Sequence, residues 1–158
     1  MSGYLEAFLL IGIAVGGTGL VFGAVTAYSS QLQGPSVSIN SAIIRQGSFM
    51  ALETLSVFNS GEVPFSYFTV STSGVSSTVL YCYTLLDPAT KSVVYSSCPG
   101  LRADPMTIGI ASPLQPGNAL LVEIMLSGAV FVVGSGLTVT VTSSAGAQAT
   151  LGVQVVPA

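Results

Sequence analysis

Hydrophobic residues are concentrated in one run near the N-terminus. From Ala7 to Ala27 the sequence has no charged residue, and only Thr18 and Thr26 interrupt its apolar character. At about 1.5 Å of rise per residue, a helix of this length spans the ~30 Å hydrocarbon core of a bilayer. We therefore expect residues 1–33 to form a hydrophobic α-helix that is surrounded by lipid or by other protein.

The apolar run contains an unusual set of glycines. Gly12 and Gly16 form one small-xxx-small pair, Gly19 and Gly23 form another, and Gly17 lies between the two pairs. Such pairs let helix backbones approach closely, although each interior glycine costs about 1 kcal/mol of helix stability relative to alanine. One interpretation is an ordinary membrane anchor that tolerates glycines. The other is a helix packed against copies of itself, with local unwinding around residues 16–19.

The pattern changes after Gly34 and Pro35, which are expected to end the helix. From there, apolar and polar residues alternate with a period of two, as in half-buried strands. Leu137, Val139 and Val141, for example, alternate with threonines, which predicts a strand with one hydroxyl face. Turn-forming residues separate a series of expected strands, which lie near 37–43, 52–58, 65–73, 78–86, 92–95, 106–111, 119–126, 129–133, 137–142 and 151–155.

Short strands at this spacing are typical of an immunoglobulin-like β-sandwich. We therefore expect two parts, a hydrophobic helix over residues 1–33 and a β-sandwich head domain over residues 34–158. The expected fold class is α+β, with the helix preceding the sandwich. A domain of about 120 residues is large enough to bury a real core.

Cys82 and Cys98 are the two cysteines of the chain. They flank an expected turn at Asp87 and Pro88, so they can lie on neighbouring segments. Outside the cytosol, such a pair can form a disulfide that adds a few kcal/mol of stability. Two buried, reduced thiols are the alternative.

Charge is scarce, and this excludes several classes of function. Charged residues make up 6% of the chain, against roughly a quarter in ordinary soluble domains. There is no histidine, and the basic residues are Arg45, Lys91 and Arg102. This inventory offers neither a histidine base, nor a histidine metal site, nor a basic surface for nucleic acid. We expect a protein that is not an enzyme, needs no cofactor or metal, and does not bind nucleic acid.

The carboxylates do not suggest a catalytic pair, because their spacing brings no two of them together. Their expected role is that of solvated surface charges, at Glu53, Glu62, Asp87, Asp104 and Glu123. No Asn-x-Ser/Thr triplet occurs, so N-linked sugar is not expected. O-linked sugar on the stretches 71–73 and 76–78 stays open, and plain exposed hydroxyls are the alternative.

The N-terminal segment resembles a known family. Residues 4–15, YLEAFLLIGIAV, with Glu6 ahead of the apolar run, resemble the N-terminal helix of archaeal type IV pilins and of the related archaeal flagellins. The resemblance is specific for roughly the first 30 residues. It implies that a prepilin peptidase removes a basic leader, which agrees with the lack of one here. It also implies that the helix first lies in the membrane and is then moved by the pilus assembly machinery into a filament core.

Two departures from the family pattern bear on this resemblance. Pilins often have a glutamate at the fifth position, whereas Glu6 is the sixth residue here and would be the fifth in a chain that began at Ser2. Glu6 either pairs with the N-terminal amine of a neighbouring subunit or marks the membrane edge. Flagellins usually have a larger outer domain, which favours an adhesive pilus.

These observations predict the structural subunit of an extracellular archaeal type IV pilus. Its partners would be identical subunits in a helical filament, and its polymerisation helix would include Glu6 and the five glycines. It would be inserted in the membrane before assembly and lie on the cell surface afterwards. The alternatives are a membrane-tethered ectodomain that binds a surface protein or ligand, a flagellin-type subunit, and a virion or secretion-system component.

Overall fold

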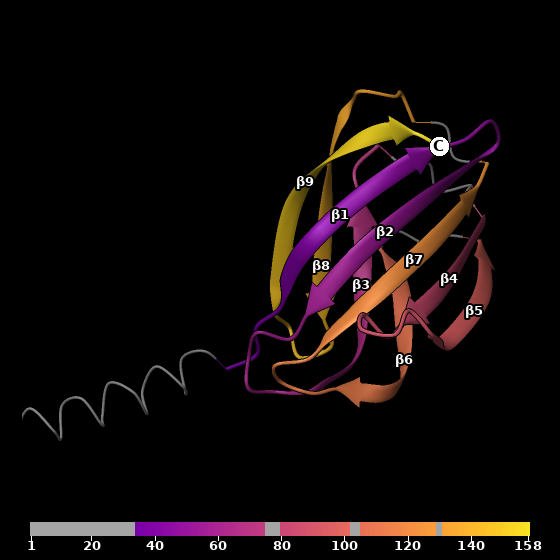
Figure 1. The fold of residues 1–158 in the computed structure, drawn as a ribbon. Helices are drawn as coiled ribbons and strands as arrows, with labels where there is room; N and C mark the ends of the chain where they lie inside the picture. The colour runs from indigo at the N-terminus through magenta and orange to yellow at the C-terminus, as the bar shows by residue number, and fades with distance from the viewer. Residues whose placement is uncertain (1–33, 75–79, 102–104, 129–130) are drawn as a thin grey trace, which may run out of the picture. The chain divides into compact units, whose positions relative to one another are not determined.

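The computed structural model describes residues 34–74, 80–101, 105–128 and 131–158. Pro35–Ala158 form one compact unit, which contains the strands labelled in Figure 1. Their bounds are β1 Ser38–Gln46, β2 Met50–Phe58, β3 Phe65–Thr72, β4 Leu80–Leu86, β5 Val93–Leu101, β6 Met106–Leu114, β7 Ala119–Ser127, β8 Gly136–Ser143 and β9 Gln148–Pro157.

The strands form a β-sandwich whose two layers are joined along one side. They hydrogen-bond in the order β5-β4-β7-β2-β1-β9-β8-β3-β6. β1 and β9 pair in parallel, with Ile44 opposite Val155, and the other neighbours are antiparallel. We name the layer of β5, β4, β7, β2 and β1 sheet A, and the layer of β9, β8, β3 and β6 sheet B. In Figure 1, sheet A lies in front of sheet B.

The expected α+β class is wrong, because the described residues form strands, turns and loops and include no helix. The physical reason is that their apolar positions repeat with a period of two and are bounded by turn formers, which favours strands throughout. The class was predicted from residues 1–33, and these lie outside the described residues, as do Glu6 and the five glycines of the apolar run. Within the described ranges, no helix has the length and apolarity needed to cross a membrane.

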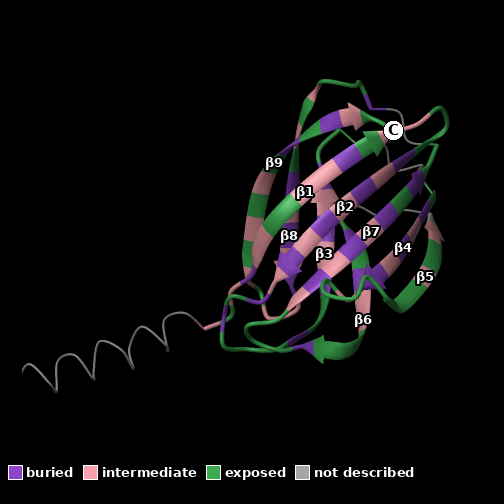
Figure 2. Ribbon diagram, in the orientation of Figure 1, coloured by how far each residue is buried: buried purple, intermediate pink, exposed green. Residues whose placement is uncertain are grey.

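The core lies between the two sheets and is filled by alternate residues of the strands. Figure 2 shows this alternation as buried and partly exposed bands along β2, β7 and β8. Val139 and Val141 are fully buried, while Thr138 is exposed, so the predicted hydroxyl-faced strand is confirmed. Phe65 and Phe68 pack edge to face in the core, with ring centroids 6.3 Å apart.

Two local predictions differ from the structure. The alternation of apolar and polar residues from 36 to 43 places Val37, Ile39 and Ile43 on one face and so predicts that Ile43 is buried, but Ile44 is the buried residue. A bulge at residue 40, between Ile39 and Ser41, inserts one residue and reverses which side chains point inward. A strand was also expected near 129–133, but residues 131–133 form a loop that leads into β8.

Candidate functional site

The outer face of sheet B is made of hydroxyl and amide side chains. Each of these residues alternates with buried or partly buried residues on the same strand, so it points away from the core. Cross-strand pairing aligns them in rows, and the Oγ1 atoms of Thr140 and Thr150 are 3.2 Å apart. We name this surface the hydroxyl face, and it comprises Thr107, Thr69, Thr142, Gln148, Ser71, Thr140, Thr150 and Thr138.

The outer face of sheet A has a different chemistry. Leu52 on β2 is opposite Met125 on β7, and Leu86 on β4 lies between Leu121 on β7 and Val93 on β5. These five residues, of which Leu86 is only 8% exposed, define what we name the apolar face. Polar residues interrupt it: Thr54, Glu123, Thr84 and Ser96 form one row, and Ser41, Ser56 and Arg45 extend the rows of the apolar residues on β2 and β1. The two outer surfaces of the sandwich are therefore unlike.

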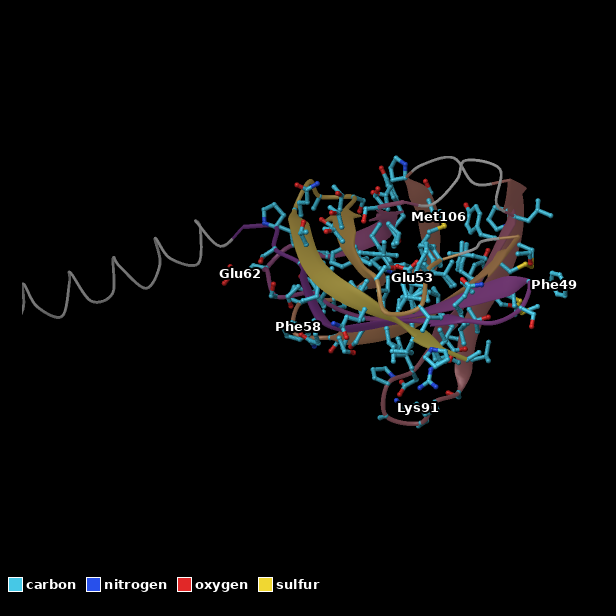
Figure 3. All side chains as sticks on the ribbon, turned by 90° about the horizontal axis from the view of Figure 1, so that it is seen from above. Phe49, Glu53, Phe58, Glu62, Lys91 and Met106 are labelled. Atoms are coloured by element: carbon cyan, nitrogen blue, oxygen red, sulfur yellow. A yellow bond between two sulfur atoms is a disulfide. The ribbon has the colours of Figure 1, made fainter. Side chains whose placement is uncertain are left out.

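The β4–β5 turn stands out from sheet A, and Figure 3 shows Lys91 on it. Asp87 fixes this turn, since its Oδ1 accepts hydrogen bonds from the backbone N–H groups of Ala89 at 2.8 Å and Thr90 at 3.0 Å. The hydrogen bond from Thr90, followed by that from Ala89, lowers the pKa of Asp87 below its ordinary value of 3.8. Asp87 is therefore a structural residue of the turn.

A third surface lies at the end of the sandwich where β1 ends and β2 begins. Phe49 in the β1–β2 turn is 82% exposed, and Val132 in the loop before β8 is 74% exposed. Leu80 and Met50 both pair with Ser127 in the sheet, which brings the start of β4 and the start of β2 to the same end. We name this surface the apolar tip; it comprises Phe49, Met50, Leu80, Val132 and Val133.

A carboxylate is buried between the sheets. Glu53 on β2 has no exposed surface, and Figure 3 shows it in the interior of the sandwich. The hydroxyl of Thr72 on β3 donates to both of its carboxylate oxygens, at 2.9 and 3.0 Å. The expectation that Glu53 is a solvated surface charge is therefore wrong. The alternation of β2 places Glu53 on the same face as Ala51, Leu55 and Val57, but its local sequence gave no signal of the partner, which comes from the other sheet.

Two tyrosines of β4 connect the sheets on the side opposite the β1–β9 pair. The hydroxyl of Tyr83 accepts a hydrogen bond from the Gly109 N–H at 3.1 Å, and the hydroxyl of Tyr81 donates to the Thr107 carbonyl at 3.5 Å. Gly109 and Thr107 belong to β6, the last strand of sheet B. The tyrosines therefore cover an edge that would otherwise expose backbone groups. Sequence analysis missed this role, although the two tyrosines are spaced to share one face of a strand.

Cys82 and Cys98 are joined by a disulfide between β4 and β5. β5 is the edge strand of sheet A, and none of its residues 93–100 is buried (Figure 2). Because β5 adds so little to the core, the covalent link is a main attachment of this strand.

The remaining sequence candidates do not come together in the described residues. Figure 3 shows Glu62 near the end where the described chain begins, far from Phe49 at the tip. Within the described ranges, no three His, Cys, Asp or Glu side chains are placed to hold a metal ion. Of the stretches considered for O-linked sugar, Thr72 is buried and residues 76–78 lie outside the description. Asp104 and Arg102 lie outside it as well.

Comparisons with known proteins do not identify a family. No family model matches the sequence, and no curated protein is significantly similar to it. The archaellum periplasmic stator protein FlaG from Sulfolobus acidocaldarius is a similar solved structure, with 12% identity, a TM-score of 0.39, and coverage of 75% of this chain and 98% of that chain.

Two further solved structures are similar at the same level. The stator protein complex of FlaF and FlaG from that organism matches with 14% identity and a TM-score of 0.34, over 74% of this chain and 87% of that chain. AvmM, which catalyzes macrocyclization in alchivemycin A biosynthesis, matches with 11% identity and a TM-score of 0.39, over 80% of this chain and 90% of that chain. Identities and TM-scores this low carry no functional argument, so function must be argued from the residues.

Proposed function

We propose that this protein is a structural subunit of an extracellular filament of the archaeal type IV pilus kind, used for surface attachment. The observation that carries the proposal is the contrast between the two outer faces of the sandwich. A subunit in a polymer presents one surface to its neighbours and another to water. The apolar face of sheet A suits contact with identical subunits, and the hydroxyl face of sheet B suits solvent.

The N-terminal sequence supports the same proposal. An uncharged run such as residues 7–27 is stable in lipid before assembly and among copies of itself afterwards, since both surroundings exclude water. Its small-xxx-small pairs permit close contact between copies. Glu6 pairs with the N-terminal amine of a neighbouring copy in this proposal, because a lone charge in a dry core is costly. A head-to-tail contact of this kind repeats into an open polymer.

Shearing cells that make the protein, followed by electron microscopy of the released fraction, tests the proposal. The chain should be recovered in filaments without detergent. A chain that leaves the membrane only in detergent would instead be a membrane-tethered ectodomain, and the proposal would be overturned.

A paired substitution tests the role of the glycines. Gly16→Leu with Gly19→Leu should abolish filaments and leave membrane insertion intact, because added side chains block close packing between copies. The matched control is Val15→Leu with Val21→Leu, which changes the same run with little change in bulk. Normal filaments from the glycine variant would refute the packing argument.

A further inference from the structure

The apolar tip is an exposed surface whose residues are not part of the hydrophobic core between the sheets. All five of its residues are between 48% and 82% exposed. The five come from the ends of strands and from two loops, whereas the hydroxyl and apolar faces lie on the flat sides of the sheets. Exposed apolar groups gathered in this way mark an interaction surface.

The backbone under the tip is held in place by hydrogen bonds. The side chain of Gln46 links the two loops, because its Oε1 accepts from the Phe131 N–H at 2.9 Å and its Nε2 donates to the Gly47 carbonyl at 2.7 Å. The Gly128 N–H donates to the Phe49 carbonyl at 2.9 Å, which fixes the turn to the end of β7. The side chains are therefore displayed outward by a fixed backbone.

In the part of the chain that the structure describes, one cation borders this apolar surface, next to Gln46 in the sequence. Arg45 is exposed at the end of β1, and cross-strand pairing places it in one row with Leu52 and Met125 of sheet A. No charged residue belongs to the tip itself. An apolar tip beside one cation matches the order of groups in a lipid layer, where phosphates lie outside the acyl chains.

We propose that the apolar tip binds a phospholipid surface, with Phe49, Val132 and Val133 entering the acyl boundary and Arg45 contacting headgroup phosphate. The inference does not require that the chain polymerises. A lipid layer is favoured over a second copy because the tip is built from projecting loops. Two projecting tips would bury little area against each other, whereas a fluid layer closes around each side chain.

The test uses the full chain in an excess of short-chain phosphatidylcholine micelles. Even if residues 7–27 are themselves bound by micelles, other micelles remain free to bind the tip. A polarity-sensitive dye is attached to Val132→Cys in one sample and to Thr138→Cys on the hydroxyl face in the other, with the native disulfide left oxidised. Emission is compared with and without nitroxide-labelled phosphatidylcholine in the micelles.

The emission of the dye at residue 132 should increase several-fold in micelles, and nitroxide-labelled lipid should quench at least half of it. The emission of the dye at residue 138 should neither increase in micelles nor be quenched by the nitroxide-labelled lipid. Phe49→Ser with Val133→Ser should reduce the quenching at residue 132 several-fold. Arg45→Gln should weaken it, and Lys91→Gln, the matched removal of a distant cation, should not. The inference would be overturned if the dyes at residues 132 and 138 showed the same emission change and quenching. It would also be overturned if the quenching at residue 132 were unchanged by Phe49→Ser with Val133→Ser. A change at residue 132 that follows protein concentration instead of lipid would identify a second copy as the partner and overturn it as well.

Discussion

The hydroxyl of Thr72 donates a hydrogen bond to both carboxylate oxygens of Glu53, and both side chains are buried. Glu53 belongs to sheet A and Thr72 to sheet B, so this polar contact crosses the core of the sandwich. A buried carboxylate is costly unless it is hydrogen-bonded. The pair therefore helps to fix how the two sheets face each other across the core.

Thr72→Val should destabilise the protein by about 1–3 kcal/mol, because it removes the donor and leaves the buried carboxylate less satisfied. Denaturant unfolding measures this change. The matched control is Thr138→Val, which removes an exposed hydroxyl and should alter stability by less than about 0.5 kcal/mol. Equal effects of the two substitutions would show that the Glu53–Thr72 contact does not stabilise the sandwich.

Tyr83→Phe should loosen the contact between β4 and β6. The substitution removes the acceptor of the Gly109 N–H, at a cost of about 1 kcal/mol. Amide hydrogen exchange should become several-fold faster at Gly109. Tyr67→Phe, which removes a hydroxyl from a tyrosine that is 46% exposed, should leave that exchange unchanged. Unchanged exchange at Gly109 in Tyr83→Phe would contradict the proposed covering of the β6 edge.

Reduction of the disulfide should destabilise the protein by about 3 kcal/mol, as expected for a closed loop of this length, with a cysteine separation of 16 residues. The loss should appear first as faster hydrogen exchange in β5, because this edge strand buries none of residues 93–100 and pairs with β4 alone. Unfolding with and without reductant measures the effect. The Cys82→Ser, Cys98→Ser variant should have the same free energy of unfolding as the reduced protein, and reductant should not change it. If the amides of β5 stayed protected from exchange in both the reduced protein and the variant, the role given to the disulfide would be refuted.

The β4–β5 turn should weaken in acid. The pKa of Asp87 is lowered in the folded protein, so its contribution is present above the unfolded pKa of 3.8 and is lost as the pH falls through the lower, folded value. The amide proton shifts of Thr90 and Ala89 should titrate with a midpoint below 3.8. Asp87→Asn should abolish that titration. A midpoint at or above 3.8 would mean that the two backbone hydrogen bonds do not favour the charged form.

Local periodicity was enough to place the strands of the described residues approximately and to predict one of the surfaces, although it also predicted a strand near 129–133, where residues 131–133 form a loop. The Leu137–Thr142 alternation predicted both the buried side of β8 and its hydroxyl side, because a strand places successive side chains on opposite faces. It failed at Ile43, where a one-residue bulge reverses the pattern. A bulge depends on pairing with a distant strand, so the alternation within β1 does not reveal it.

The contacts that join the sheets could not be predicted in the same way. Glu53 resembles any other scattered carboxylate until β3 brings Thr72 to it from another layer. The hydroxyls of Tyr81 and Tyr83 likewise find their partners on β6, more than 20 residues along the chain. The apolar tip is formed by three separate parts of the sequence, in which Phe49, Leu80 and Val132 come together only through the strand order.

The contrast between the two outer faces is the central claim, and one pair of substitutions tests it most directly. Met125→Asp places a charge on the apolar face, and Thr138→Asp places the same charge on the hydroxyl face; both positions are exposed, so both variants should fold. Filaments in the sheared cell-surface fraction, counted by electron microscopy, should fall at least tenfold for Met125→Asp and stay near the wild-type number for Thr138→Asp. Equal filament numbers from the two variants would contradict the account.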